Sequence, residues 1–395
     1  MSATEPVDRR RTAGQWWDSA EPFVVVKIAE LERVGVAAYE AAGAGPDDAA
    51  FLFRTNLDKA IQGDHARGLV KVPGLIAEAR AGRLDLAPEI DVSNERAGTA
   101  IVDGGPQASG RLVCRAAMAL AIEKASVCGI GLVGARASGE LLTPYVRQAT
   151  EAGMIGMAMV QSVPTVAPYG GRGPLLGNAP FAVGIPAGER DPLLLDMSFT
   201  ESSASGVLLA ARQGQPVPPG VLLDEHGEPT VDAGEFPDHT LAQQFGDFCV
   251  RGTLVPVGAG HKGYAMVLVI GLLSSLLSDT SPPWELYYHL DERGRYGTLL
   301  WAVDPTAFSG AAAPGVGARV DSFLDRVKGA PRTSGTDEIL YPGERSQQLG
   351  RERRARGTIA VPRSHVDGIA QLAADLGIAP PEIVDLDDSP ESASE

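Results

Sequence analysis

Two glycine-rich stretches in the middle of the chain constrain its fold more than any other feature. Residues 154–180 contain the segments MIGMAMVQS, PYGGR and GNAP, and residues 258–264 read GAGHKGY. Because glycine has no Cβ, such segments let the backbone approach a ligand closely. Short apolar runs and a few polar side chains separate the glycines. We therefore expect this region to form a cradle for a bound cofactor.

Length and composition indicate an ordinary globular protein of two or three structural units. The chain has 395 residues and a net charge of −16. This charge argues against a nucleic-acid partner or an anionic membrane, because either would require a basic face. The longest apolar run, residues 265–277, is shorter than the roughly 20 residues that cross a bilayer. The charged first eleven residues have no apolar core, so we expect no signal peptide.

Cysteine and histidine usage offers no metal or disulfide pattern. Cys114, Cys128 and Cys249 are odd in number and lack the short spacings of a zinc site. We expect reduced, mostly buried thiols, which indicates a cytoplasmic protein. No two of the six histidines have metal-ligand spacing, so we expect no metal.

Helical and strand patterns interleave along the chain, which is typical of a mixed α/β or α+β fold. Apolar spacing predicts helices at 23–42, 46–61, 70–79, 109–128, 140–152, 265–277, 320–327 and 365–376. Short apolar runs between turn residues predict strands at 100–102, 130–133, 157–160, 181–185, 193–196, 254–257 and 298–303. Residues 213–230 and 236–246 are expected to be loops. Residues 1–20 and the acidic tail 380–395 are expected to be disordered.

Residues 258–263 match the spacing G-x-G-x-x-G between an expected strand and an expected helix. In that context the motif binds the phosphates of a dinucleotide, and Lys262 would pair with a phosphate. The segment lies far too late for an N-terminal dinucleotide fold, and no strand-end acid follows about 20 residues on. The alternative interpretation is a tight strand-to-helix turn with a solvated lysine.

Ionisable residues form a second set of candidates. Asp64, His65 and Arg67 share a loop, and Lys71 follows closely. They predict either an anion-binding, proton-transferring loop or a charged surface loop. Asp196 follows an apolar strand, where a carboxylate is either a buried hydrogen-bond partner or an acid/base group with a raised pKa.

Two further segments have simpler interpretations. Glu140 lies near an expected helix start, where the helix dipole favours a carboxylate. Residues 202–206 contain three serines but no partner set for a nucleophile, so we expect a loop.

Together these segments resemble the type 2 malate/L-lactate dehydrogenase family, a group of NAD(P)-dependent reductases. The likeness runs from about residue 25 to residue 378. The matching segments are EAGMIG (151–156), APYGGR (167–172), PLLGNAP (174–180), LDM (195–197), GHKGY (260–264), AVDPTAF (302–308) and YPGE (341–344).

The resemblance implies a mixed α/β fold in which the nicotinamide-binding domain is not of the Rossmann type. It implies a cofactor-binding domain at residues 126–294 and a discontinuous helical/α-β domain, for substrate and dimerisation, at 21–125 with 295–379. It also implies NAD or NADP as the cofactor, a small-molecule substrate and a homodimer. The implied cofactor-binding residues are Gln161, Ser162, Gly177, Asn178, Pro180, His261, Lys262 and Gly263.

The chain departs from the family's pattern at residues that perform its chemistry. The family's serine, acid/base histidine and substrate-binding arginine align with Ala66, Arg67 and Lys71. The family's histidine near the nicotinamide aligns with Glu140, and the lysine of its Arg-Gly-Lys segment aligns with Val207. Losing a positioned acid/base typically reduces the rate by about 10²–10⁴-fold. We therefore expect a diverged active site.

Other residues would then move the proton, because a guanidinium stays protonated at neutral pH. The candidate catalytic residues are Asp196, His65, Glu140 and Arg67. Arg67 and Lys71 would also bind the anionic group of the substrate.

The expected function is an NAD(P)H-dependent oxidoreductase acting on C=O or C=N of a small carboxylated substrate in a specialised biosynthetic pathway. The replaced histidines favour an alternative, a non-redox lyase, isomerase or cyclase on the same scaffold. A third hypothesis is a binding subunit without catalytic activity.

Overall fold

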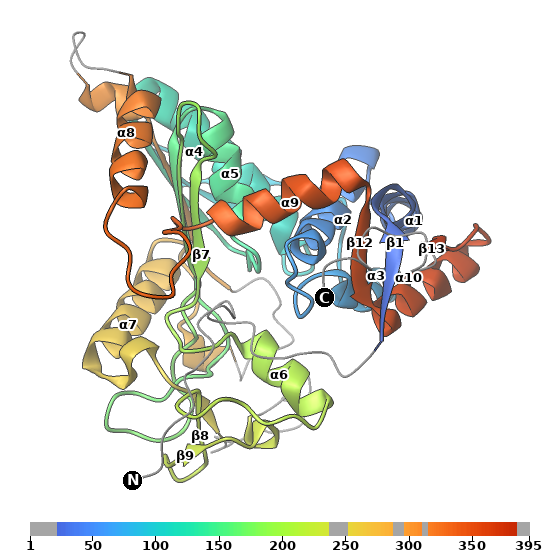
Figure 1. The fold of residues 1–395 in the computed structure, drawn as a ribbon. Coiled ribbons are helices and arrows are strands. Elements are labelled where there is room, and N and C mark those ends of the chain that lie inside the picture. The colour runs from blue at the N-terminus through green and yellow to red at the C-terminus, as the bar shows by residue number, and fades with distance from the viewer. Residues whose placement is uncertain (1–21, 237–251, 287–295, 310–314, 385–395) are drawn as a thin grey trace.

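The computed structural model describes residues 22–236, 252–286, 296–309 and 315–384. These residues form a large mixed sheet with helices on both faces, and a smaller helical unit beside it (Figure 1). None of the helices in the described ranges has the length and apolar content to cross a membrane.

The large sheet has seven strands in the order β2-β3-β4-β11-β5-β6-β7. β3 and β4 run parallel, and every other neighbouring pair is antiparallel. This differs from the parallel order of a Rossmann sheet. The strands are β2 (Asp91–Ser93), β3 (Thr99–Asp103), β4 (Ile130–Ala135), β5 (Ile155–Val160), β6 (Phe181–Ile185), β7 (Leu193–Met197) and β11 (Thr298–Val303).

Both faces of this sheet are buried, because alternate residues of the central strands enter different cores. Ala158 and Leu300 pack beneath α4 (Gly110–Cys128) and α5 (Thr143–Glu151). Met159 and Leu299 pack with α7 (His261–Leu276) on the other face. A small sheet of β8 (Leu222–Leu223), β9 (Pro229–Thr230) and β10 (Thr253–Leu254) adjoins this second core.

The helical unit consists of α1 (Ile28–Ala41), α2 (Pro46–Ile61), α3 (Val72–Arg80) and α10 (Arg363–Leu376). They cover a three-stranded antiparallel sheet of β12 (Thr358–Pro362), β1 (Phe23–Lys27) and β13 (Ile383–Val384). Gly35 allows α1 to approach α2 closely, since a Cβ there would overlap the ring of Phe53. The core of this unit is separate from the two cores of the large sheet.

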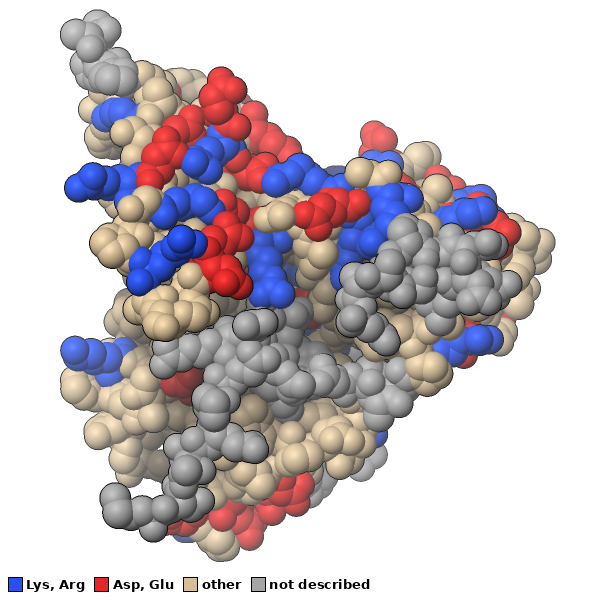
Figure 2. Space-filling model, in the orientation of Figure 1, with Lys and Arg blue, Asp and Glu red and all other residues tan. Residues whose placement is uncertain are grey.

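Helix α9 (Glu344–Arg356) connects the two units (Figure 1). At its first turn, Gln347 donates to the carbonyl of Pro192 beside β7, at 2.9 Å. Near its end, Arg353 donates to the carbonyl of Ile61 at the end of α2, at 2.8 Å. Basic side chains gather where Figure 1 draws this helix, interspersed with acidic ones (Figure 2).

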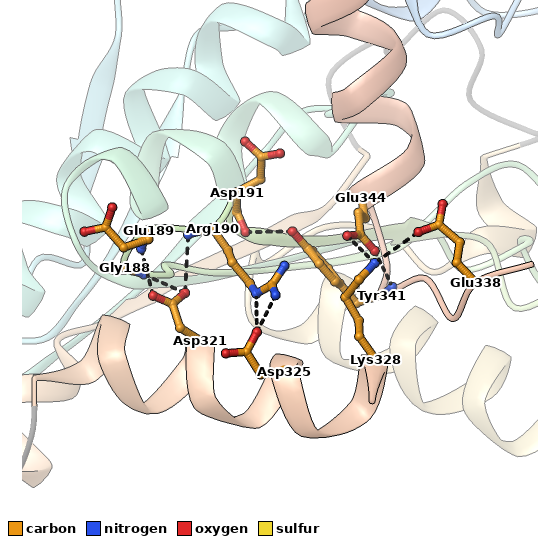
Figure 3. Close-up of polar contacts among 10 residues, drawn as sticks. All are labelled: Gly188, Glu189, Arg190, Asp191, Asp321, Asp325, Lys328, Glu338, Tyr341 and Glu344. Carbon is orange, nitrogen blue, oxygen red and sulfur yellow. Dashed lines mark hydrogen bonds and ion pairs between the residues drawn. The ribbon is translucent and has the colours of Figure 1, made fainter. Parts of the chain in front are cut away.

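Helix α8 (Val316–Lys328) lies against the turn between β6 and β7 and is held mainly by polar contacts (Figure 3). Asp321 accepts hydrogen bonds from the backbone N–H groups of Gly188 at 3.1 Å and Glu189 at 2.7 Å. Lys328 pairs with Glu344 at 2.6 Å and so ties α8 to the start of α9. Leu324 is the buried residue of this helix.

The structure corrects several expected elements. Residues 23–27 form a strand, not the start of a helix, because pairing with β12 buries Val25 and Val26. Residues 204–212, expected to begin as a loop, form α6 (Ala204–Arg212), which Ser203 caps by accepting from Gly206 N at 3.1 Å. α5 begins at Thr143, three residues later than expected, because Glu140 has a φ of 52°.

Other corrections concern the chain ends and the cysteines. Residues 383–384, within the tail expected to be disordered, pair with β1 as β13. Cys114 is buried but Cys128 is exposed, so the expectation of mostly buried thiols is wrong for Cys128. Cys249, residues 1–20 and most of the expected loop 236–246 lie outside the described residues. The domain boundaries at 126 and 295 stay a prediction. β3 and β11 lie outside the predicted cofactor-binding domain of residues 126–294, yet both hydrogen-bond to β4, which lies inside it.

Candidate active site

A cleft of about 1580 Å³ lies between the edge of the large sheet at β7, helix α9 and the helical unit. Pockets for one small ligand measure roughly 300–1,000 Å³, so this cleft has room for a cofactor and a substrate together. It brings together most of the catalytic, substrate-binding and cofactor-binding residues that were predicted from the sequence. These lining residues are His65, Arg67, Lys71, Glu140, Gln161, Ser162, Asn178, Pro180 and Asp196.

Asp196 lies near the end of β7 and is held by groups from two other elements. Its Oδ2 accepts from Thr143 N at 3.1 Å and from the Thr143 hydroxyl, and lies 3.5 Å from Lys59 Nζ. Burial raises the pKa of Asp196, but Lys59, Arg67 and the Thr143 hydrogen bonds outweigh it, so the pKa is lowered. Of the two alternatives that the sequence left open for Asp196, the structure agrees with the hydrogen-bond partner and not with the raised pKa, so Asp196 is an ionised carboxylate at neutral pH.

Arg67 lies in the loop that follows α2 and pairs with Asp64 of the same loop at 2.7 Å. Burial lowers the pKa of Arg67, but Asp64 and Asp196 outweigh burial and the pKa is raised. The guanidinium therefore supplies a permanent positive charge to the cleft. Its side chain is 34% exposed, which leaves it accessible to a ligand.

His65, in the same loop, is a neutral imidazole at neutral pH. Burial, followed by His365 and Arg353, lowers its pKa to about 4. Its ring packs edge-on against Phe23, with 5.3 Å between centroids. Its Nδ1 is buried and has no hydrogen-bond partner among the described residues. This environment resembles that of a packed core histidine more than that of a proton donor.

Glu140 belongs to a hydrogen-bonded chain that links the two sides of the cleft. Arg111 of α4, only 5% exposed, donates to Glu140 Oε2 at 2.6 and 3.0 Å and to Asn56 Oδ1 at 2.6 Å. Asn56 of α2 in turn donates to the carbonyls of Arg67 and Gly68, each at 3.1 Å. Burial raises the pKa of Glu140, but Arg111 outweighs it and the pKa is lowered. Glu140 is thus an ionised, anchored carboxylate.

The cleft wall around the ends of β5 and β6 fits a nicotinamide dinucleotide. Ser162 donates to Asn178 Oδ1 at 2.6 Å and accepts from Asn178 N at 3.0 Å. Gly177 allows these segments to meet, since a Cβ there would lie 2.6 Å from the carbonyl oxygen of Ser162. Gln161 is anchored to the carbonyl of Ser281 at 2.6 Å. The hydroxyl of Ser162 and the side-chain amides of Gln161 and Asn178 are groups that can hydrogen-bond to a ribose and a nicotinamide amide, and the close backbone packing at Gly177 brings them together.

The second glycine-rich segment forms a left-handed turn that leads into α7. Gly258 and Ala259 have φ values of 74° and 46°. Gly263 packs against the backbone of the same turn, because a Cβ there would collide with the carbonyl of Val257. His261 and Lys262 are exposed and, with Gly263 and Gly177, are not among the residues that line the cleft. Val257, at the start of the turn, is the nearest residue that does line it.

Several residues of the site were missed by the sequence argument. They are Asn56, Lys59, Arg111 and Thr143. A signal existed for two of them, since Asn56 and Lys59 lie three positions apart within an otherwise apolar face of α2, which is a helix neighbour spacing. No group of three potential metal-ligating side chains occurs within the described ranges.

The strand order and the cleft define a mixed α/β protein with a ligand site between two units. Comparison with known proteins identifies the family. A family model described as malate/L-lactate dehydrogenase matches residues 26–370. The chain therefore belongs to the malate/L-lactate dehydrogenase family.

Individual relatives agree with this assignment. The L-sulfolactate dehydrogenase of Methanothermobacter thermautotrophicus is 32% identical over 333 residues, which are 82% of this chain and 88% of that protein. The Delta(1)-pyrroline-2-carboxylate/Delta(1)-piperideine-2-carboxylate reductase of Pseudomonas putida is 31% identical over 270 residues, 68% of this chain and 75% of that protein. The structure of malate dehydrogenase from Entamoeba histolytica covers 91% of this chain and 100% of its own, with a TM-score of 0.82 and 21% identity, and supports the fold alone.

These findings confirm the family, the mixed α/β fold, and the expectation of an enzyme from a family of NAD(P)-dependent oxidoreductases. The roles of the individual site residues stay predictions.

Proposed function

We propose that this chain is an NAD(P)H-dependent oxidoreductase that acts on C=O or C=N of a small carboxylated substrate. The main support is that one cleft contains both the Ser162–Asn178 wall and a group of cations around Asp196. Two relatives, a sulfolactate dehydrogenase and a pyrroline-2-carboxylate/piperideine-2-carboxylate reductase, have names that describe such substrates.

Gln161, Ser162, Asn178 and Pro180 would hold the cofactor, with Gly177 allowing their close approach and residues 261–263 supporting the wall from α7. When bound, a nicotinamide cofactor supplies or accepts a hydride. His261 and Lys262 would take part only where the cofactor extends beyond the cleft.

The chain's own side chains would bind and orient the substrate. Arg67 and Lys71, which line the cleft on the side of the helical unit, would bind its carboxylate, since guanidinium and ammonium groups are the usual partners of carboxylates. Asp196 is ionised and would take part in the proton transfer between the protein and the substrate oxygen. Glu140 is also ionised and would contribute negative charge opposite these cations.

The active site is diverged under this proposal, because Arg67 and Glu140 stand where the family has histidines. One observation favours the alternative of a non-redox lyase, isomerase or cyclase. Asp196 and Glu140 are both ionised carboxylates, and a carboxylate base can remove a proton beside a substrate carboxylate without any cofactor.

We further propose a cytoplasmic homodimer that works in a biosynthetic pathway. The dimer is supported by α7, which has no polar face and exposes Met266, Val269, Leu272 and Leu276. A helix that is apolar on all sides is normally buried, and a second copy of the chain would cover it. Light scattering after size-exclusion chromatography tests this, and a monomer at micromolar concentration contradicts it.

The test of the proposed activity begins with binding. Pure protein is titrated with NADH and with NADPH, and the nicotinamide fluorescence is followed. We expect saturable binding of at least one, and absence of binding of both refutes the proposal. Arg67→Met should leave cofactor affinity unchanged and raise the KM for a 2-oxo acid, whereas the control Arg54→Met, an exposed residue paired with Glu32, should change neither. Turnover of a substrate without any change in nicotinamide absorbance supports the non-redox alternative.

A further inference from the structure

We propose that Lys59 is the proton donor of this active site. It would work as a pair with Asp196 and take over the acid/base role that a histidine has in the family. This inference rests on the proposed oxidoreductase function and deepens it. Lys59 was not nominated by the sequence, and its side chain is among those that line the cleft.

The geometry supports a working pair. Lys59 lies in the last turn of α2, where the helix carbonyls favour a positive charge. Its Nζ is 3.5 Å from Asp196 Oδ2, and the two side chains are 10% and 11% exposed. A lysine is rarely so buried unless it is paired. The remaining exposure is what a proton donor needs, since both groups line the cleft and stay within reach of a substrate.

The other candidates from the sequence are poor donors. Arg67 keeps its proton, because its pKa is raised. His65 is neutral, with a pKa of about 4. Glu140 and Asp196 are ionised, so neither has a proton to give at neutral pH. The remaining proton donors are the ammonium groups of the two lysines that line the cleft, Lys59 and Lys71.

Lys59 is a better candidate than the second lysine of the cleft. Lys71 is exposed to solvent and faces the charge of Glu140. Lys59 instead contacts Asp196, the carboxylate that the Thr143 hydroxyl and backbone hold in place. An anchored carboxylate orients the donor in the way that a second group orients the base of a catalytic pair.

The proton step balances in both directions. In reduction, the substrate carbon receives the hydride that reduced cofactor supplies, and the C=O π electron pair moves to oxygen. The Nζ–H bond of Lys59 breaks as the new O–H bond forms, which leaves a neutral amine beside Asp196. A proton from solvent in the cleft restores the ammonium. In oxidation, the neutral amine takes the hydroxyl proton.

Lys59 interacts electrostatically with Asp196 of β7 and with Asp58, its neighbour on α2. Arg67, in the loop that follows α2, also acts on Asp196. Arg147 pairs with Asp58 at 3.5 Å. Of the two carboxylates, only Asp196 lines the cleft.

Lys59→Arg is the decisive variant, because it keeps the positive charge beside Asp196 but offers a group that does not release its proton. Wild type and variant are compared for the reduction of pyruvate and oxaloacetate, and for NADH and NADPH affinity by fluorescence. We expect unchanged cofactor affinity and a kcat lower by about 10²–10⁴-fold. A kcat within about threefold of wild type overturns the inference, since a purely structural ion pair would survive in arginine.

Lys124→Arg is the matched control. Lys124 is as buried as Lys59 and pairs with Glu95 at 2.9 Å, and it is not among the residues that line the cleft. We expect it to retain wild-type kcat. A comparable loss of kcat in this control would show that replacing a buried lysine by arginine lowers kcat wherever it occurs, and would contradict the inference.

A second variant keeps the inference testable where Lys59→Arg fails to fold. In Lys59→Ala, added ethylamine should restore activity in proportion to its concentration, and guanidine should not. Rescue by both, or by neither, overturns the inference. Wild-type protein that binds neither NADH nor NADPH refutes the proposed function itself. Wild-type protein that binds cofactor but reduces neither acid overturns the inference as stated.

Discussion

Replacement of Arg111 by methionine should destabilise the protein and disturb the loop that contains Arg67. Methionine preserves most of the apolar stem, so the change removes chiefly the guanidinium. Arg111 is 5% exposed and donates to Glu140 and Asn56. Asn56 holds the carbonyls of Arg67 and Gly68.

The size of the effect follows from the burial of each partner. Asn56 is fully buried, so its Oδ1 would lose its donor without gaining water, which costs about 1–3 kcal/mol. The side chain of Glu140 is 47% exposed, so its carboxylate can rehydrate, and the lost ion pair contributes only about 0.5–1 kcal/mol. The expected loss of stability is the sum of the two, about 1.5–4 kcal/mol.

Urea unfolding followed by circular dichroism measures this difference. The control is Arg115→Met, one turn further along α4, where the arginine pairs with Asp48 and lies over the ring of Phe51 but is 32% exposed. We expect the control to lose at most about 1 kcal/mol. Equal losses in both variants, below about 1 kcal/mol, would refute the argument from burial. The KM for a 2-oxo acid should rise in Arg111→Met alone, because only that variant releases the loop.

Two further outcomes are expected. Gly177→Ala should weaken NADH binding and destabilise the fold by about 1–3 kcal/mol, because a Cβ would lie 2.6 Å from the carbonyl of Ser162. The control is Gly350→Ala in α9, where a Cβ meets nothing within 4 Å. We expect this control to stabilise the fold by about 0.5–1 kcal/mol. His65 has a pKa lowered to about 4 by burial, so the unfolded chain binds its proton first, and stability should fall by about 2 kcal/mol between pH 8 and pH 5. His65→Gln should reduce that fall in urea unfolding at the two pH values, and an identical pH dependence in both proteins would contradict the lowered pKa.

The sequence was informative wherever local pattern decides structure. Short apolar runs between turn residues predicted β5, β6, β7 and β11, because a strand buried on both faces is apolar throughout. Pattern failed at residues 23–27, where three valines also fit a helical face. Only the pairing with β12, more than 300 residues away, makes them a strand.

The residues of the candidate site also differ in whether the sequence could predict them. The glycine-rich segments and the loop of Arg67 could be found from residue type and family likeness. Lys59 and Arg111 could not, because their importance depends on contacts with Asp196 and Glu140 across the fold. For Asp196 the sequence left a hydrogen-bond partner and an acid/base group with a raised pKa as alternatives, because it does not show that Lys59, which lowers this pKa, lies beside the carboxylate.

The central position of β11 has a consequence for synthesis of the chain. β4 and β5 each need β11 as a neighbour, yet roughly 160 residues separate the end of β4 from its start. At translation rates of about 5–20 residues per second, the nascent chain would wait on the order of 8–30 s with one edge of β4 and one edge of β5 unpaired. Unpaired strand edges promote association between chains. We therefore expect the fold to complete only near the end of translation, and the yield of soluble protein to depend on chaperones that bind extended apolar segments during that interval.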